Sequence, residues 1–507
     1  MSDNPLVFGK NDLKKIVSIE PYNDECIAYY ENNDGVYSAK FPNRYWILSD
    51  IQIHPEWKRL KGDLHYKWGK QYTNKKEWQN DRSRLKHKYD IYSIYDSKEA
   101  FMCLKGLTYF KGLKPKDVSI LSFDIETTTL DPNDPKAKVL LISNTYRKGD
   151  KIYKNLFAYD NYESEEAMII AWCDYVRKSD PSIIIGHNIN GFDLKYLKQR
   201  AYKQSLSLGR DNSDLRTNTF ESKFRKDGSQ DLHYFKHHIY GREIVDTMFL
   251  AYKYDIGRNY PSYGLKPIIK YEGLESPNRT FYDASKIREN YKDPIEWAKI
   301  KEYCKDDSDD ALKLFDLMAP AQFYLAQSIP KSFQQLTESA TGSQLNSFLI
   351  RSYLQNGHSI PKTSDTSEHV KGGISFGIPG VYSNVIKIDL KSAYPSQILR
   401  FKLFDPEKDP EGNFYKMVHH FTYERFDLKK QYKETGDKYF YDREQANKIV
   451  INSAYGMLNT PGLNFNNNEL AKKITLETRN MIEFSLKWAS NKDMEFYKQY
   501  MREEENV

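Results

Sequence analysis

The sequence contains little cysteine and no long apolar run. Its 507 residues include four cysteines, Cys26, Cys103, Cys173 and Cys304, with no CxxC pair among them. Such sparse cysteine argues against a zinc site or a disulfide framework, and it favours a reducing cytoplasm, or the host cytoplasm if the protein is viral. No stretch approaches the roughly eighteen apolar residues of a membrane span, and the N-terminus has no apolar signal core. We therefore expect no association with a membrane.

The sequence also lacks a strong charge of either sign. The 76 Lys and Arg residues against 70 Asp and Glu leave a formal charge of +6, which permits a polyanionic partner without requiring one. Forty tyrosines and seven tryptophans could stack on nucleic-acid bases, although most aromatic side chains fill cores. The length predicts about two to four domains.

The first 116 residues are predicted to form an N-terminal domain of short strands with a basic, Trp-rich section. Trp46, Trp57, Trp68 and Trp78 alternate there with Lys and Arg. Two interpretations stay open, a nucleic-acid face or a charged surface over a small core. Residues 117–320 alternate strand and helix patterns, as in an α/β layer fold. An insertion at about 205–240 contains SKFRKDGSQDLHYF, whose DG turn predicts a β-hairpin.

Acidic residues recur in a pattern that suggests a metal site. In LSFDIETTTL, Asp124 and Glu126 stand two apart on a predicted strand and therefore share a face. Like charges at that separation raise each other's pKa unless a cation lies between them. Asp193 is expected at the head of a helix, and Tyr303 and Asp307 stand four apart on a later helix. Four carboxylates suit two Mg²⁺ or Mn²⁺ ions about 4 Å apart.

The choice of acid on the last helix is left open by the sequence. Asp306, Asp309 and Asp310 compete with Asp307 in the run KDDSDD. Each of the three acidic segments alone is weak evidence for a metal site. The interpretation depends on the order and spacing of all three.

Three segments, FDIET, GHNINGFDLKYL and YCKDD, resemble the Exo I, Exo II and Exo III motifs of the 3′–5′ proofreading exonuclease domain in family B DNA polymerases. GREIVDTM and SYGLKPI also stand where that family has a strand ending in Asp and its following helix. The resemblance implies an RNase H-like fold and a two-metal exonuclease. Asp124, Glu126, Asp193 and Asp307 would then be the catalytic metal ligands, and Tyr303 would orient the attacking water.

The same resemblance implies contacts with DNA. Asn188 and Phe192 would bind the single-stranded 3′ end, and the hairpin at 221–240 would help separate primer from template. The segment HVKGGISFGIPG, which includes Gly372 and Gly373, is similar to the DNA-binding linker of the family but lacks its tyrosine. This linker and the compact fingers give the resemblance a bacteriophage-like character.

A second acidic strand is predicted in VIKIDLKSAYPSQI, which resembles polymerase motif A. An ordinary strand, turn and helix with an Asp cap is the alternative for this segment alone. The resemblance implies that Asp389 is a catalytic metal ligand and that the Leu390 carbonyl is a further oxygen ligand. Tyr394 would lie under the sugar of the incoming dNTP.

The segment NKIVINSAYG resembles motif B of the fingers. Lys448, Asn452 and Tyr455 fall at i, i+4 and i+7, so they form one stripe of a helix. By resemblance, Lys448 would neutralise the triphosphate of the dNTP, and Asn452 and Tyr455 would contact the nascent base pair. Lys433 would also bind phosphate, whereas Lys429 stands where the family usually has Arg.

Motif C of this family, a YxDTDS hairpin, is missing from residues 457–507, which contain no DxD, and no thumb follows. One palm acid cannot clamp two metal ions in the usual way. We expect either that a second polypeptide supplies motif C and the thumb or that the chain is truncated, and we favour the divided form because the exonuclease and fingers motifs are intact.

The predicted fold class is therefore a multidomain α/β and α+β protein. Its expected parts are an N-terminal domain (1–116), an RNase H-like exonuclease domain (117–320), a helical segment and linker (321–383), a partial palm (384–423), fingers (424–485) and a truncated return to the palm (486–507).

The leading functional hypothesis is the N-terminal portion of a DNA-directed DNA polymerase with 3′–5′ exonuclease activity. Its partners would be primer–template and single-stranded DNA, the second polypeptide and a sliding clamp. The alternatives are a stand-alone exonuclease and a non-catalytic nucleic-acid-binding subunit.

Overall fold

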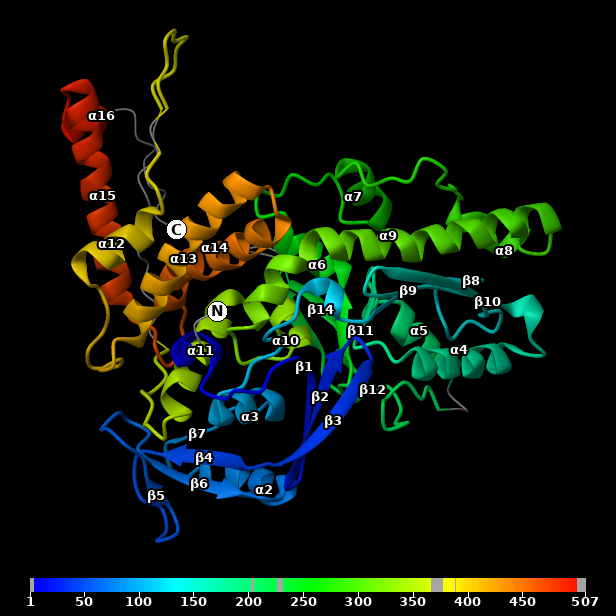
Figure 1. Ribbon diagram of the computed structural model, residues 1–507, viewed down its shortest axis with the longest axis horizontal. Helices are drawn as coiled ribbons and strands as arrows, with labels where there is room; N and C mark the ends of the chain where they lie inside the picture. Colours follow the sequence, from blue (N-terminus) through cyan, green and yellow to red (C-terminus); the bar gives the residue numbers. More distant parts are fainter. Residues whose placement is uncertain (1–3, 202–204, 226–230, 366–376, 388, 499–507) are drawn as a thin grey trace.

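The computed structural model describes residues 4–201, 205–225, 231–365, 377–387 and 389–498. A strand-rich N-terminal region, a helix-covered sheet and a group of C-terminal helices follow one another along the chain (Figure 1). The fold is mixed α/β and multidomain, as the sequence predicted.

The N-terminal region contains two antiparallel sheets. Their strand orders are β1-β2-β3 and β5-β6-β4-β7. The elements of this region are α1 (Pro5–Phe8), β1 (Ile16–Tyr22), β2 (Glu25–Asn32), β3 (Gly35–Pro42), β4 (Tyr45–Ser49), β5 (Lys58–Arg59), β6 (Trp68–Tyr72), α2 (Lys75–Leu85), β7 (Ile91–Tyr92) and α3 (Ser97–Lys105).

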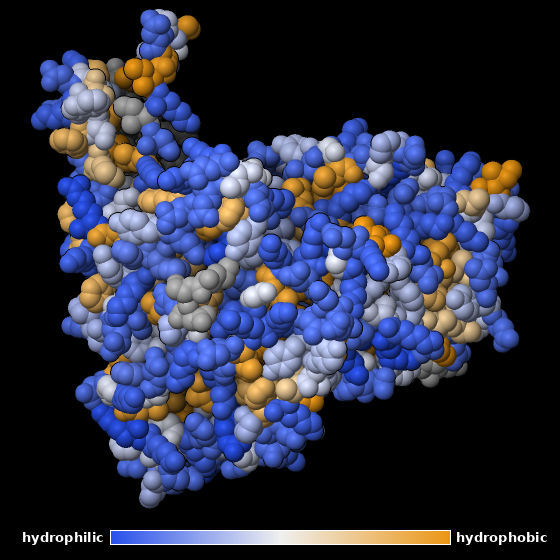
Figure 2. Space-filling model, in the orientation of Figure 1, coloured by the Kyte–Doolittle hydropathy of each residue, from blue (hydrophilic) through white to orange (hydrophobic). Residues whose placement is uncertain are grey.

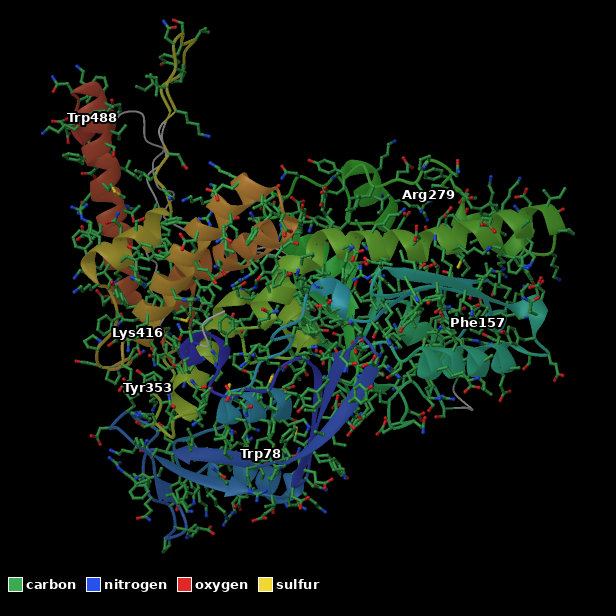
Figure 3. The ribbon with its side chains drawn as sticks, viewed as in Figure 1. Trp78, Phe157, Arg279, Tyr353, Lys416 and Trp488 are labelled. Atoms are coloured by element: carbon green, nitrogen blue, oxygen red, sulfur yellow. The ribbon has the colours of Figure 1, made fainter. Side chains whose placement is uncertain are left out.

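The tryptophans of the basic N-terminal section are mainly core residues. Trp46, Trp57 and Trp78 are at most 3 % exposed, and the Trp78 ring stacks on Tyr45 with centroids 5.5 Å apart. Figure 3 shows Trp78 between the elements of this region. The three buried rings cannot receive bases from outside, so a row of stacking tryptophans is not formed and the interpretation as a charged surface over a small core is supported.

A five-stranded sheet forms the centre of the next part of the chain. Its order is β10-β9-β8-β11-β16, in which β8 pairs antiparallel with β9 and parallel with β11. Its elements are β8 (Ile120–Thr127), β9 (Val139–Lys148), β10 (Lys151–Ala158), α4 (Glu165–Ser179), β11 (Ile183–Gly186), α5 (Asp193–Arg200), β16 (Glu243–Asp246) and the short 3₁₀ turns Pro115–Asp117 and Tyr159–Asn161.

The two faces of this sheet are covered by different helices. Phe123 and Ile125 belong to a cluster with α4 and α5, where Phe123 lies 4.9 Å from the Trp172 ring. Leu141 and Cys304 belong to a cluster on the face covered by α9 (Pro294–Ala326). Figure 1 shows α9 along one face and α4 and α5 along the other. Side chains alternate along a strand, so Asp124 and Glu126, which alternate with Phe123 and Ile125 on β8, face α9.

The predicted insertion contains short strand pairs. β13 (Ser222–Arg225) and β14 (Asp231–Tyr234) form an antiparallel hairpin whose turn lies outside the described residues. β12 (Arg216–Thr217) pairs with β15 (His237–His238). The hairpin prediction is confirmed for its two arms.

Helices dominate the chain after β16. They are α6 (Thr247–Tyr254), α7 (Leu265–Tyr271), the 3₁₀ turn Ala284–Lys286, α8 (Ile287–Asn290), α9, α10 (Phe333–Glu338), α11 (Thr341–Leu354), α12 (Ala393–Phe401), α13 (Asn413–Thr435), α14 (Lys438–Leu458), α15 (Asn468–Ser490) and α16 (Met494–Lys498). Asp293 caps α9 by accepting hydrogen bonds from the Ile295 and Glu296 amides, and Pro294 occupies its first turn.

The C-terminal helices form one packed group. α13 and α14 are neighbours in a helical hairpin, and α14 also packs against α9 and α11. Helical structure over residues 424–485 therefore agrees with the prediction, although α13 begins earlier, at Asn413. The predicted boundary at residue 320 falls inside α9, which is continuous to Ala326.

The described residues of the predicted strand VIKID, 385–387 and 389, do not form a strand. Residues 385–387 and 389 have no strand partner, and the side chains of Val385 and Ile386 are 74 % and 84 % exposed. Figure 1 shows residues 377–387 standing away from the helical group near α15, and Figure 2 shows apolar side chains on the surface there. A strand needs a neighbour to receive its backbone hydrogen bonds, and none is described beside this segment.

Two further features bear on the sequence predictions. Over the part of the chain that is described, no helix is both long and apolar enough to cross a bilayer. The four cysteines are buried and free.

Candidate active site

Strand β8 presents two acids to the face covered by α9. Asp124 is partly buried and Glu126 is buried, and both point away from the cluster that holds Phe123 and Ile125. The Cys304 sulfur of α9 lies 3.9 Å from Asp124 Oδ2. The predicted alternation of this strand is confirmed.

Asp193 reaches the same strand from the first residue of α5. Its Oδ1 accepts a hydrogen bond from the Ile125 amide at 3.3 Å, so the carboxylate lies against the backbone between Asp124 and Glu126. Gly186, at the end of β11, lies close to β8, because a Cβ at that position would lie 3.0 Å from the Phe123 carbonyl oxygen.

The loop that precedes Asp193 is fastened by Asp246 at the end of β16. Asp246 accepts hydrogen bonds from the amides of Asn188 at 2.9 Å and Asn190 at 3.3 Å, and it also caps α6 through the Met248 amide at 3.0 Å. Asn188 has a φ of 63°, a left-handed conformation that asparagine tolerates. The sequence placed Asp246 at a strand end but did not predict this fastening role.

His187 supports the same loop from its other side. Its Nδ1 lies 3.0 Å from the Thr247 hydroxyl, and its Nε2 donates to the Tyr263 carbonyl oxygen at 2.8 Å. Burial lowers the pKa of His187 to about 4, so the ring is neutral at physiological pH.

The structure selects Asp307 from the run of acids on α9. Asp307 is buried, and its charge raises the pKa of both β8 acids. The other three acids have different partners: Asp306 accepts from the Thr280 amide, Asp309 pairs with Lys154, and Asp310 pairs with Arg279 and Lys313. Asp307 is therefore the acid of this run whose charge acts on Asp124 and Glu126, and its role as a metal ligand stays a prediction.

Two basic residues that sequence reasoning missed lie against Asp307. Lys266 Nζ is 3.2 Å from Asp307 Oδ2 and also donates to the Tyr303 hydroxyl. Arg279 donates to Asp307 Oδ1 at 2.5 Å and to Asp310 Oδ2 at 2.7 Å. Figure 3 shows Arg279 on the loop beside α9. Neither residue belongs to a periodic pattern, and only the fold brings them to α9.

Burial and neighbouring negative charge raise the pKa values of the acids. Burial, followed by the charge of Asp307, raises the pKa of Glu126 to about 8, and burial raises the pKa of Asp193 to about 8. Burial and the neighbouring acids Asp307, Asp193 and Glu126 raise the pKa of Asp124 well above its usual range. Burial and the nearby carboxylates also raise the pKa of Tyr303, so its phenol keeps its proton. Lys266 and Arg279 offset only part of the negative charge of the cluster, and a bound cation would offset more of it.

The donor set is suited to a hard divalent cation. In the portion of the chain described, one group of three metal-capable side chains has its ligand atoms within 4.8 Å of one another, namely Asp124, Glu126 and Cys304. Asp193 and Asp307 adjoin this group without joining it at that distance. Four carboxylates are the ligands that Mg²⁺ and Mn²⁺ prefer. Burial raises the pKa of the Cys304 thiol, which therefore stays neutral in this arrangement.

Comparison with known proteins shows what this sheet is similar to. Residues 37–268 match the family described as DNA polymerase family B, exonuclease domain. These residues are therefore similar to the exonuclease domain of that family. The matched range includes Asp124, Glu126 and Asp193, whereas Tyr303 and Asp307 follow it in the chain.

Related proteins extend the similarity beyond the exonuclease domain. The chain is 23 % identical over 462 residues to a DNA polymerase of Thermococcus gorgonarius, covering 83 % of this chain and 57 % of that protein. It is 26 % identical over 418 residues to DNA polymerase 1 of Pyrococcus abyssi, covering 75 % and 52 %. The chain thus spans about half the length of these curated relatives. Both are archaeal, so the bacteriophage-like character suggested by the linker stays a prediction.

A solved structure shows the same fold. The family B DNA polymerase of Pyrobaculum calidifontis superposes with a TM-score of 0.73 at 18 % identity, covering 94 % of this chain and 71 % of that chain. The fold similarity therefore reaches past the exonuclease domain into the C-terminal helices.

The predicted DNA-binding residues divide into two groups. Asn188 and Phe192 lie on the loop fastened by Asp246, immediately before Asp193, and Phe192 packs on Tyr196 with ring centroids 5.4 Å apart. Gly372 and Gly373 lie outside the described residues.

The predicted nucleotide-binding residues come together only in part. The rings of Tyr394 on α12 and Tyr455 on α14 stack with centroids 4.5 Å apart. Lys448 is partly buried on α14 and Asn452 is exposed on the same helix, whereas Lys433 is exposed near the end of α13. Asp389 is exposed and Leu390 is partly buried, and both precede α12 in a stretch without regular structure.

One residue near motif A was missed by sequence reasoning. Arg425 of α13 donates to the Ser392 hydroxyl at 3.0 Å and to Glu444 of α14 at 2.6 Å. It therefore joins the start of α12 to both helices of the hairpin.

Proposed function

We propose that this chain is a 3′–5′ exodeoxyribonuclease that uses two Mg²⁺ or Mn²⁺ ions, within a proofreading family B DNA polymerase. The observation that carries the proposal is the convergence of Asp124, Glu126, Asp193 and Asp307 from three separate elements. Their raised pKa values mark a cluster built with more negative charge than the protein neutralises.

The four carboxylates would hold the cations. When bound, the two cations would activate a water and stabilise the departing 3′ oxygen. Tyr303 keeps its proton and can orient that water through its hydroxyl. Lys266 and Arg279 neutralise Asp307 in this arrangement, and Arg279 also fixes its position through Asp310.

The experiment that tests the proposal follows degradation of a 5′-labelled single strand of DNA. The unaltered protein should produce a ladder that shortens from the 3′ end with Mg²⁺ or Mn²⁺, and a 3′-terminal block should prevent it. Asp124→Ala/Glu126→Ala should lower the rate on the order of a thousandfold. Glu163→Ala removes an exposed acid outside the cluster and should leave the rate unchanged. Digestion by the double variant at the unaltered rate would refute the ligand assignment.

We propose further that Asp389, Leu390, Tyr394, Lys433, Lys448, Asn452 and Tyr455 belong to a dNTP site that is incomplete within these 507 residues. The stacked Tyr394 and Tyr455 rings support the pairing of motifs A and B. Primer–template would be the substrate, with Gly372 and Gly373 along the DNA and a sliding clamp as a further partner. The proposed location of the activity is the cytoplasm.

Primer extension tests this second proposal. Residues 1–507 alone should not extend a primer, because motif C and the thumb must come from further sequence, in this polypeptide or in a second one. Addition of that sequence should restore extension in the unaltered protein and not in Asp389→Ala. Extension by residues 1–507 alone would refute the requirement.

A further inference from the structure

A groove of about 570 Å³ opens beside α7, next to the carboxylate cluster. Its walls combine flat apolar groups, Pro261, Pro267, Tyr271 and Phe281, with the side chain of Lys270. Lys266 and Glu275 complete the lining.

Lys266 joins this groove to the exonuclease site. Its side chain lines the groove, and its ammonium group contacts the Tyr303 hydroxyl and Asp307. A ligand in the groove would therefore lie within one side-chain length of the acids that hold the reacting end of the DNA.

The rings of Tyr271 and Phe281 each contact a neighbouring side chain and are otherwise largely exposed. Tyr271 is 55 % exposed and meets the Tyr260 ring edge-on at 5.1 Å. Phe281 is 62 % exposed and has the Arg279 guanidinium over its ring at 4.9 Å. Exposed rings that are anchored on one side provide stacking platforms at low entropic cost, because little freedom remains to be lost on binding.

The charge in the groove is suited to a phosphodiester. The lining contains two lysines, Lys266 and Lys270, and one acid, Glu275, and the Lys266 ammonium also pairs with Asp307 of the carboxylate cluster. Lys270 makes no ion pair with any residue that the structure describes, so its ammonium is available to a ligand.

We infer that this groove binds one of the last three nucleotides of the single DNA strand, with the base on Tyr271 and Phe281 and a phosphate on Lys270. The inference rests on the proposed exonuclease function. The groove would hold the strand by its base and backbone while the neighbouring acids act on the 3′-terminal phosphodiester.

Binding and kinetics of two variants test the groove. Tyr271→Ala and Lys270→Ala should each raise the KM for a labelled oligo-dT strand by about fivefold or more, with kcat unchanged. The Kd, measured by fluorescence anisotropy in the Asp124→Ala/Glu126→Ala background, should rise in parallel. Tyr22→Ala and Lys151→Ala remove exposed residues of the same types elsewhere on the surface and should change neither constant by more than about twofold.

Salt dependence separates the two contacts. Lys270→Ala should reduce the slope of log Kd against log salt concentration by about 0.7, the value for one phosphate contact on a single strand. Tyr271→Ala should leave the slope unchanged, because stacking displaces no counterion.

Abasic residues placed in turn at the last three positions locate the base. At the position that occupies the groove, the abasic site should weaken binding as much as Tyr271→Ala does, and the two changes together should add little. Full additivity at all three positions would overturn the inference.

The outcomes distinguish the groove from the exonuclease itself. Unaltered KM and Kd in both variants, in a protein that digests DNA, would overturn the groove and leave the exonuclease standing. Weakened binding in the variants of a protein that digests no DNA would support the groove and refute the exonuclease.

Discussion

The acids on β8 and the acid before α12 follow similar sequence patterns, yet their surroundings differ completely. Asp124 and Glu126 lie on a strand with neighbours on both sides and a helix across its face. Asp389 lies exposed in a stretch without regular structure, and the apolar side chains just before it are also exposed. An acid at the end of an apolar segment can contribute to a metal site only when other elements bring further ligands beside it.

The difference originates in packing rather than in the segments themselves. β8 receives backbone hydrogen bonds from β9 and β11, and its acids meet Asp193 and Asp307 from helices on either side. No described strand pairs with residues 385–387. The four acids of the proposed nuclease site lie on elements that pack together within the described chain, whereas Asp389 is exposed in a stretch without regular structure.

The largest expected contrast is between single-acid variants of the two regions. Asp193→Ala and Asp307→Ala should each reduce single-strand digestion on the order of a hundredfold to a thousandfold, because each removes a proposed metal ligand. Asp389→Ala should digest DNA at the unaltered rate. If Asp389→Ala and Asp307→Ala lowered the digestion rate equally, the proposed difference in function between the β8 acids and Asp389 would be refuted.

A smaller contrast separates two buried aspartates that each accept several backbone hydrogen bonds. Asp246→Ala should lower the free energy of unfolding by about 3 kcal/mol and reduce digestion more than tenfold, because it releases the loop before Asp193. Asp409→Ala is a matched control, since Asp409 accepts from the Asn413 and Phe414 amides and from the Tyr353 hydroxyl.

The control should lose comparable stability while digesting at the unaltered rate. Denaturant titration and the 3′–5′ digestion assay supply the two readouts. If Asp246→Ala loses stability and retains full activity, the loop does not depend on this carboxylate.

The third expectation concerns pH and divalent cations. Glu126 and Asp193 have a pKa of about 8 in the folded protein, through burial and neighbouring charge, whereas in the unfolded chain both ionise near pH 4. Between these values the folded state binds more protons than the unfolded state, so stability without cations should fall as the pH rises from about 5 to 8. Mg²⁺ or Mn²⁺ should oppose this loss.

Thermal unfolding at two pH values checks the expectation. The cation should raise Tm by about 2 °C or more at pH 8.5 and by less at pH 5.5, because protons compete with it at the lower pH. Asp124→Asn/Glu126→Gln should remove the cation effect, and Asp389→Asn should retain it. A cation effect that is independent of pH would contradict the raised pKa values.

The smallest effect is expected from the tyrosine pair in the C-terminal region. A double-mutant cycle on Tyr394→Ala and Tyr455→Ala should give a coupling energy of about 1 kcal/mol, as expected for a stacked pair. Tyr394→Ala with Tyr441→Ala, a tyrosine outside this pair, should show no coupling. Neither variant should change the rate of digestion, and a loss of digestion would link the two regions.

The sequence predicted the elements that bear the acids because their signals are local. Alternation places Asp124 and Glu126 on one face, and a spacing of four places Tyr303 and Asp307 on one face of α9. The choice among the acids of α9 could not be predicted, because it depends on Lys154, Arg279 and Lys313 from other parts of the chain.

Other features were hidden because they depend on contacts between distant segments. Lys266 and Cys304 reach the site through the packing of α7 and α9 with the sheet, and although they stand in the segments SYGLKPI and YCKDD, sequence reasoning assigned no role to either side chain. The prediction of a strand at residues 385–389 was wrong for the described residues of that range, and the reason is the converse one. Its apolar pattern is suited to a strand, but the described chain offers no edge on which that strand could pair.

Helix α9 imposes a condition on any dissection of this protein. Its 33 residues extend for about 50 Å, with Tyr303 and Asp307 in one half and a buried apolar surface from Leu312 to Ala326 in the other. A nuclease fragment that ended at residue 320 would interrupt α9 within this apolar surface. The apolar side chains that remain would be exposed to water, which favours aggregation. A fragment intended to retain the nuclease alone should therefore include all of α9. It should also provide a substitute for the surface of α14 against which α9 packs.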